Sequence, residues 1–399
     1  MFNSDILMYM HRRIFLQSSF CIPALALPNW VFADNNFWSR VFADMPSELA
    51  QKASNPEYRV QILSQCRKKN TDARWQTTSW QLTPKQWFST ASVAKMPIAL
   101  LACEKFAALG LDLSAKIGFT QPPIGGEWPN DEPYFESLQR TLTRIFTISE
   151  NPPFNRLYDF LGVDAMNERL NALGYPSTRL ISRMSAPVVD NHRTRAGMVL
   201  NAKGVPAYEF AERVGQQRVF AYGDALIGKG FLKDSGELIA GPHDFSKTNF
   251  ISLSDTQQML KAIVDPASVP EHQRWAIPEL MRDQVLQIMA MLPRQSTDPI
   301  YPEAEYPDGY GRFFILGDVK TRKPESLTLI GKVGEAYGYL TDVEYISETG
   351  SEWECFLSAN IYVNADGIFN DDQYEYESIG YPFLAALGRA VWQTVQSAE

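Results

Sequence analysis

The chain has 399 residues, of which 45% are hydrophobic and 21% are charged. This composition is typical of a globular protein with ample core-forming residues, arranged as one large domain or two interleaved subdomains. The net charge of −9 and the absence of a basic stripe argue against a nucleic-acid partner, because a phosphate-binding surface needs excess positive charge. The four histidines show no metal-ligand spacing, so no metal or other cofactor is expected.

The N-terminal residues have the pattern of an export signal. The pair Arg12-Arg13 precedes an apolar stretch through Leu27, and Val31-Phe32-Ala33 offers a small-residue cleavage site. The paired arginines resemble a twin-arginine signal. The apolar stretch is shorter than the roughly 20 residues that a membrane span needs, and prolines interrupt it. We therefore predict a signal peptide at 1–33, a mature domain at 34–399, a periplasmic or secreted bacterial location, no stable membrane span and a monomer.

Cysteine usage says little about function. Cys21 would leave with the signal, and Cys66, Cys103 and Cys355 remain as an odd set without C-x-x-C spacing. At most one disulfide can form among these three. Cys103 lies within an apolar helical pattern and is interpreted as a small core residue.

Strand patterns stand at both ends of the mature chain, with helical patterns between them. We expect early strands at 58–63 and 75–80, helices at 92–109, 138–148, 155–161, 166–173, 254–264 and 278–292, strands at 312–316, 327–334, 339–347 and 353–362, and a final helix at 382–396. Residues 181–250 are irregular and are interpreted as loops or an insertion. This order suits an α/β (α+β) fold in which an antiparallel sheet subdomain built from both termini receives an inserted all-α subdomain, with a cleft at the seam.

A serine and a lysine three positions apart begin the helix predicted at 92–109. Residues i and i+3 share a helix face, so the amine of Lys95 is expected to lie against the hydroxyl of Ser92. A serine hydroxyl is a poor nucleophile until a base takes its proton, and a lysine beside it can act as that base. Taken alone, the pattern also fits a capped amphipathic helix with a solvated lysine.

Two further motifs follow in the chain, Ser149-Glu150-Asn151 and Lys332-Val333-Gly334. The first is followed by two prolines, which disfavour helical backbone before them, so we expect a turn whose side chains point into the cleft. The second lies in a predicted strand. Individually, Ser149 could cap a turn, Asn151 could brace its own loop and Lys332 could be an exposed strand lysine.

Together, the three motifs resemble the penicillin-recognising serine hydrolases, and class A β-lactamases most closely, which carry S-x-x-K, S-D-N and K-T-G in this order. Asn155 fits an asparagine that follows the second motif in that family, and residues 337–343 resemble the continuation of its third-motif strand. The resemblance extends from about residue 60 onward. It implies a β-lactamase/transpeptidase-like fold.

The resemblance also implies a role for each motif residue. Ser92 would form an acyl-enzyme with Lys95 as base or proton relay, and Ser149 would pass a proton to the leaving nitrogen. Asn151 would bind the substrate amide. Lys332, beside Gly334 in the substrate-binding strand, would supply positive charge that either tunes Ser149 or attracts a substrate carboxylate. The backbone N–H groups of Ser92 and Glu335 would form the oxyanion hole.

The sequence departs from the family pattern at several positions. Glu150 replaces the usual aspartate, while Val333 lacks the hydroxyl that the family directs at a substrate carboxylate. Glu335 adds an acidic side chain beside the same place. Both changes in the third motif weaken the case for penicillins as the natural substrate.

The glutamate that activates water for deacylation in class A enzymes is also missing. The matching stretch, 178–187, contains no carboxylate. Asp190 lies slightly beyond it and could substitute, whereas Glu168 imitates the motif within a predicted surface helix. Without such a base the acyl-enzyme would persist.

Three functions therefore stay open. The first is a serine hydrolase that turns over a β-lactam or a related amide. The second is a penicillin-binding D,D-peptidase that acts on a peptidoglycan-derived substrate and forms a long-lived penicilloyl adduct. The third is a non-catalytic sensor for a β-lactam or peptidoglycan.

Overall fold

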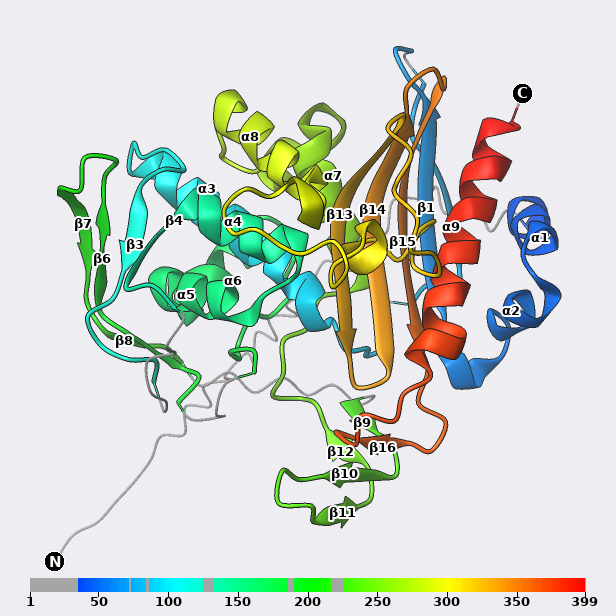
Figure 1. Ribbon diagram of the computed structural model, residues 1–399, viewed down its shortest axis with the longest axis horizontal. Coiled ribbons are helices and arrows are strands. Elements are labelled where there is room, and N and C mark those ends of the chain that lie inside the picture. The colour runs from blue at the N-terminus through cyan, green and yellow to red at the C-terminus, as the bar shows by residue number, and fades with distance from the viewer. Residues whose placement is uncertain are drawn as a thin grey trace, which may run out of the picture. The chain divides into compact units, whose positions relative to one another are not determined.

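A five-stranded antiparallel sheet lies at the centre of the fold (Figure 1). The computed structural model describes residues 35–71, 73–83, 86–124, 132–185, 190–216 and 225–398, so the predicted signal peptide lies outside it. The sheet order is β13 (Leu327–Ala336), β14 (Tyr339–Glu348), β15 (Trp353–Tyr362), β1 (Gln61–Lys68) and β2 (Gln76–Trp80). Because β1 pairs with β15, strands from the early and late parts of the described chain meet in one sheet, as predicted.

The terminal helices cover one face of this sheet (Figure 1). Helix α9 (Tyr381–Gln396) packs on β14 and β15, while α1 (Asn35–Asp44) and α2 (Ser47–Lys52) pack on α9. The core on this side is apolar and includes the fully buried side chains of Ile62, Leu340, Leu357 and Leu387. Burial of such side chains removes apolar surface from water, which fixes α9 against the sheet.

The other face carries the inserted, mainly helical part of the chain. Its α-helices are α3 (Lys95–Ala108), α4 (Leu138–Thr147), α5 (Asn151–Leu161), α6 (Val163–Ala172), α7 (Leu253–Val264) and α8 (Glu279–Ala290). Helix α7 packs on β14 and β15, and α8 lies against β13. Helix α3 is buried almost all round, in keeping with its continuous apolar sequence, and runs through this second core.

The inserted part also contributes strands to small sheets that the sequence analysis did not predict, one of which includes β16 from the C-terminal part of the chain. One has the order β4-β3-β6-β7, and three smaller sheets have the orders β5-β8, β12-β9 and β11-β10-β16. Their strands are β3 (Lys116–Gly118), β4 (Phe135–Ser137), β5 (Arg193–Thr194), β6 (Gly197–Leu200), β7 (Pro206–Phe210), β8 (Arg213–Val214), β9 (Leu226–Ile227), β10 (Gly230–Leu232), β11 (Leu238–Ala240), β12 (His243–Asp244) and β16 (Ile368–Phe369). Strands this short are too brief to show an alternation of apolar and polar residues. The sequence of 181–250 therefore predicts loops.

Three local predictions need correction. The segment 312–316 is not a strand: its backbone turns, and the N–H groups of Phe313 and Phe314 donate to Asp342 Oδ2 at 2.9 and 2.8 Å. Helix α5 begins at Asn151 rather than 155, because prolines fit the first helical turn, where no N–H partner is needed. Helix α7 begins at Leu253 rather than 254, because Ser252 caps it: the Ser252 Oγ accepts from Asp255 N at 3.1 Å.

Within the described ranges, none of the helices is both long enough and apolar enough to cross a bilayer.

Candidate active site

Ser92 lies in a short 3-10 turn, Ala91–Ala94, that leads directly into α3. The predicted helix start at 92 therefore falls one turn before the α-helix itself. Ala91 has a positive φ of 40°, a strained conformation for a residue with a side chain, immediately before the serine. Lys95, the first residue of α3, is fully buried, and its Nζ lies 2.8 Å from Ser92 Oγ.

The second motif meets this pair from the turn between α4 and α5. Lys95 Nζ donates to the carbonyl oxygen of Ser149, lies 3.2 Å from Ser149 Oγ and donates to Asn151 Oδ1 at 2.6 Å. Ser149 has a positive φ of 65°, so this turn departs from ordinary helical backbone. The buried amine of Lys95 thus contacts polar atoms of both the first and the second motif.

The third motif comes from β13, the edge strand of the five-stranded sheet. The buried Lys332 Nζ donates to Ser149 Oγ at 2.7 Å and to Val333 O at 2.9 Å. A Cβ on Gly334 would lie 2.6 Å from the carbonyl oxygen of Thr90, closer than side-chain atoms pack. Glycine at 334 therefore lets β13 approach the Ser92 turn. The structure brings all the motif residues together.

Burial sets the protonation of both lysines. Loss of solvation lowers the pKa of Lys95 to about 7, although the nearby Glu150 carboxylate acts in the opposite direction. Loss of solvation also lowers the pKa of Lys332 well below its ordinary value, helped by the positive charges of Lys95 and Arg312 and opposed by Asp342. Near neutral pH, Lys95 therefore exists in part as a neutral amine that can accept a proton.

The carboxylate of Glu150 is held by hydrogen bonds from Arg144 and Tyr301. It accepts from Arg144 Nε and Nη2 at 2.9 and 2.7 Å and from the Tyr301 hydroxyl at 2.7 Å. Arg144 also bonds Glu132 and Glu136, which makes a largely buried ion-pair network beneath the turn. Glutamate in place of the usual aspartate thus anchors the Ser149 turn to α4 and to the chain near Tyr301.

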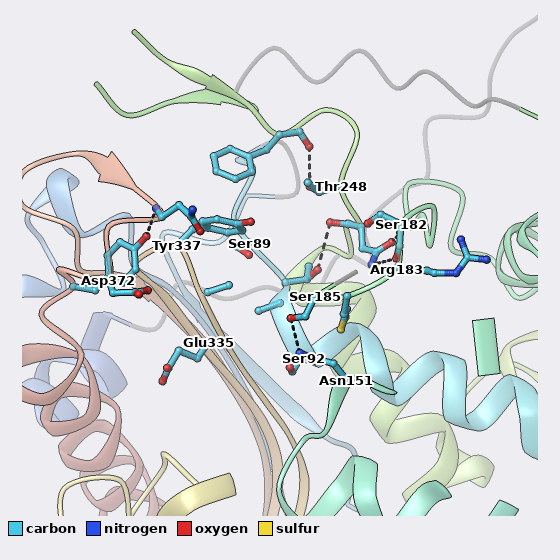
Figure 2. A pocket seen from close by; sticks show the side chains of 18 of the residues that line it. Ser89, Ser92, Asn151, Ser182, Arg183, Ser185, Thr248, Glu335, Tyr337 and Asp372 are labelled. Carbon is cyan, nitrogen blue, oxygen red and sulfur yellow. Dashed lines mark hydrogen bonds between the residues drawn. The ribbon is translucent and has the colours of Figure 1, made fainter. Parts of the chain in front are cut away.

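Two cavities meet at the serine. One has a volume of about 590 Å³ and the other about 790 Å³, and Ser92, Asn151 and Glu335 line both. Figure 2 shows Ser92 and Asn151 close to Ser185 in the first cavity, with Glu335 and Tyr337 along the opposite wall. The site is thus an open cleft with space on both sides of the nucleophile candidate.

The segment 178–185 forms part of the first cavity and is held by side-chain amides. Asn155 donates to Met184 O and accepts from Met184 N, both at 2.9 Å. Asn249 accepts from the N–H groups of Ile181 and Ser182 at 2.7 and 3.0 Å. Four residues of this segment, Ser182, Arg183, Met184 and Ser185, line the cavity, and the segment contains no carboxylate.

Ser185 is a site residue that the sequence analysis missed. Its Oγ accepts from Asn151 Nδ2 at 2.7 Å (Figure 2). No motif pointed to it, since it lies 34 positions from Asn151 in sequence.

Neither deacylation candidate raised by the sequence lies in the cleft. Asp190 is exposed and is not among the described residues that line either cavity. Glu168 is exposed on α6, in keeping with the predicted surface helix. Within the described ranges there is also no group of three or more His, Cys, Asp or Glu placed to hold a metal ion.

The chain matches the model of the Beta-lactamase enzyme family (Beta-lactamase2) over residues 73–353. The chain belongs to that family. The match covers all three motifs and the strand β13 that carries the third, which confirms the resemblance to penicillin-recognising serine hydrolases. No curated protein matches the chain significantly.

Solved structures share the fold of this β-lactamase-family chain at low sequence identity. PBP-A is 13% identical with a TM-score of 0.50, and the match covers 91% of this chain and 97% of that one. A leucine-to-glutamate mutant of PBP-A, solved as an acyl-enzyme with penicillin G, is 13% identical with a TM-score of 0.50, over 90% and 96%. A β-lactamase from Desulfarculus baarsii is 15% identical with a TM-score of 0.49, over 90% and 99%.

Proposed function

We propose that this protein is an exported serine hydrolase of the class A β-lactamase type that is acylated at Ser92 and hydrolyses a β-lactam or a related amide. The observation that carries the proposal is the buried Lys95 amine, 2.8 Å from Ser92 Oγ, with a pKa near 7. A neutral amine at hydrogen-bond distance is what a serine needs to become a nucleophile.

In the proposed reaction, Lys95 takes the hydroxyl proton while Ser92 Oγ bonds to the substrate carbonyl carbon. The negative charge on the carbonyl oxygen is stabilised by the backbone N–H groups of Ser92 and Glu335, and each such donor is typically worth about 3 kcal/mol of barrier. The carbon–nitrogen bond then breaks as the proton passes through Ser149 to the leaving nitrogen. The bonds from Lys95 and Lys332 to Ser149 support this relay.

Asn151 and Lys332 would position the substrate. The amide of Asn151 now bridges Lys95 and Ser185, so binding of a substrate amide would replace the bond to Ser185. Lys332 has no direct access to solvent and acts through Ser149 in this account. Gly334 keeps β13 close enough to the Ser92 turn for both oxyanion donors to face one carbonyl oxygen.

A second candidate is a penicillin-binding D,D-peptidase that deacylates slowly. The observation in its favour is the segment 178–185, which borders the cleft but offers no carboxylate to activate water. A leucine-to-glutamate mutant of PBP-A, a protein of the same fold, was solved as an acyl-enzyme with penicillin G, so this fold can hold a penicilloyl group.

Time-resolved intact-mass spectrometry with benzylpenicillin and a chromogenic cephalosporin separates these candidates. Substrate loss with a transient adduct supports the hydrolase, and a lasting stoichiometric adduct without turnover supports the penicillin-binding enzyme. If neither compound acylates the protein, the β-lactam assignment is wrong, and a non-catalytic binding role or a different amide substrate remains.

A further inference from the structure

The charge of the second cavity bears on the substrate of the proposed reaction. Its described lining contains six acidic residues and two basic ones: Glu303, Glu305, Asp308, Asp318, Glu335, Glu377, Lys320 and Arg322. Three of the acidic groups are in ion pairs, namely Glu303 with Arg322, Asp308 with Arg294 and Asp318 with Arg389. Among the described residues, Glu305, Glu335, Glu377 and Lys320 form no ion pair. The cavity beside Ser92 therefore carries excess negative charge.

Glu335 places that charge next to the reacting serine. It lines both cavities together with Ser92, and its carboxylate accepts a hydrogen bond from the Tyr381 hydroxyl. Desolvation in the cleft raises the pKa of Glu335 above its ordinary value, the Tyr381 bond opposes this rise, and Glu377 adds to it. The Tyr381 bond orients the carboxylate at the point where the two cavities join.

Lys332, the lysine of the third motif, does not offset this charge. Lys332 is buried and already donates to Ser149 and Val333, and its pKa is well below that of a free lysine. Val333, which also lines the second cavity, offers no hydroxyl. A substrate carboxylate beside Glu335 would therefore face a carboxylate of the protein, and Lys332 is not free to pair with it. The described cations of the second cavity, Lys320 and Arg322, are outnumbered by its six acidic residues.

We propose that Glu335 is a specificity-determining residue that selects a substrate carrying a cationic group, such as an ammonium, rather than a carboxylate on the side of the scissile bond that faces the second cavity. This inference rests on the proposed acylation at Ser92. An ammonium there would be attracted by Glu335, whereas a carboxylate would be repelled by it.

Matched substrates test this inference. Chromogenic esters with one acyl group and leaving groups that end in an ammonium, a neutral amide or a carboxylate are compared by kcat/KM. We expect the wild type to prefer the ammonium ester over the carboxylate ester by about tenfold or more at low salt. The preference should shrink towards unity in Glu335→Gln and persist in Glu352→Gln, which changes an exposed glutamate remote from the cleft.

Two outcomes would overturn the specificity role of Glu335: a wild-type preference for the carboxylate ester, or the same preference in Glu335→Gln as in wild type. Failure of the proposed function looks different, because then none of the three esters would react faster with wild type than with Ser92→Ala.

A separate observation concerns two cysteines in the sheet. Cys66 on β1 and Cys355 on β15 are directly opposite each other in the antiparallel register, and their Sγ atoms lie 3.0 Å apart. This is closer than two non-bonded sulfur atoms ordinarily approach, and about 1 Å more than the length of a disulfide bond. Both side chains are buried, whereas Cys103 lies on α3 in the other core.

Burial of the two thiols in the sheet limits when a disulfide between Cys66 and Cys355 can form. Burial raises the pKa of the Cys355 thiol well above its ordinary value, and the neighbouring Cys66 adds to this effect. The reactive thiolate is therefore rare once the sheet has formed. Oxidation is expected during folding, before β1 and β15 close over the sulfur atoms.

We infer that Cys66 and Cys355 form a cross-strand disulfide when the chain folds in an oxidising compartment. In this step the two thiols lose two protons and two electrons to an external disulfide, which is reduced to two thiols, and one sulfur–sulfur bond forms. The bond would join residues 289 positions apart, across the pairing that unites the two ends of the mature chain. Closing so large a loop restricts the unfolded chain and so stabilises the folded one.

Oxidative refolding tests this pairing. The full chain is refolded in a glutathione redox buffer, free thiols are alkylated under denaturing conditions, and non-reduced peptides are mapped. We expect a linked peptide pair containing Cys66 and Cys355, and a higher melting temperature than for the reduced protein. Cys66→Ser should lose both effects, and Cys103→Ser should keep them. A linkage through Cys103, or no linkage after oxidative refolding, would overturn the inference.

Discussion

The side chain of Asn155 holds Met184 by both of its backbone groups, at 2.9 Å each. Asn155 belongs to α5, four residues after Asn151, so one helical turn carries both a candidate substrate-binding amide and the anchor of the segment 178–185. The segment is therefore positioned beside Ser92, although no residue in it can serve as a carboxylate base.

A carboxylate introduced at Met184 should speed deacylation. Met184 lines the first cavity together with Ser92, so a glutamate there could reach a water near the acyl bond. We expect Met184→Glu to shorten the lifetime of a penicilloyl adduct by about tenfold or more relative to Met184→Gln, since general-base catalysis commonly contributes about a hundredfold. The measurement is the decay of adduct mass after removal of free penicillin. Equal lifetimes in the two variants would show that position 184 does not reach the water.

The acylation rate should rise with pH through about pH 7, following Lys95. Protonated Lys95 cannot accept the Ser92 proton, so below its pKa the rate falls with the neutral fraction. At pH 5 acylation should be about a hundredfold slower than on the plateau above pH 8, because each pH unit below the pKa lowers the neutral fraction about tenfold. Stopped-flow measurement of acylation gives this profile. A rate that is flat from pH 5 to 8 would exclude Lys95 as the base.

Loss of the Glu150 charge should destabilise the fold more than it alters acylation chemistry. The carboxylate accepts two bonds from Arg144 and one from Tyr301, and Arg144 is almost fully buried. We expect Glu150→Gln to lower the free energy of unfolding by about 2 kcal/mol, the usual scale for hydrogen bonds to charged groups. Urea unfolding, with Glu352→Gln as an exposed control, measures the change. A free energy of unfolding equal to that of the control would contradict the anchoring role.

The sequence predicted the candidate site best where the residues of the site lie close together in the chain. Ser92 and Lys95 are one turn apart, so their contact followed from helix geometry alone, and the long strands β13, β14 and β15 followed from their apolar and β-branched composition. The convergence of Lys332 on Ser149, 183 positions away, could be expected only through the family resemblance.

Features built from distant side chains could not be predicted in this way. Asn249 holds the backbone of Ile181 and Ser182 from 68 and 67 positions away, and no local pattern marks such an amide. The two-to-five-residue strands in 181–250 are fixed by pairing with each other and with residues outside the segment, such as those of β3 and β16, and not by their own propensity.

The most direct test of the central claim is to locate the acyl group after reaction with benzylpenicillin. The acid-quenched protein is digested and its peptides are sequenced by mass spectrometry, alongside Ser92→Ala and Ser89→Ala, which removes another serine of the same cavity. The account predicts a penicilloyl group on Ser92 in wild type and Ser89→Ala, and none in Ser92→Ala. An adduct on another residue, or an undiminished adduct in Ser92→Ala, would contradict it.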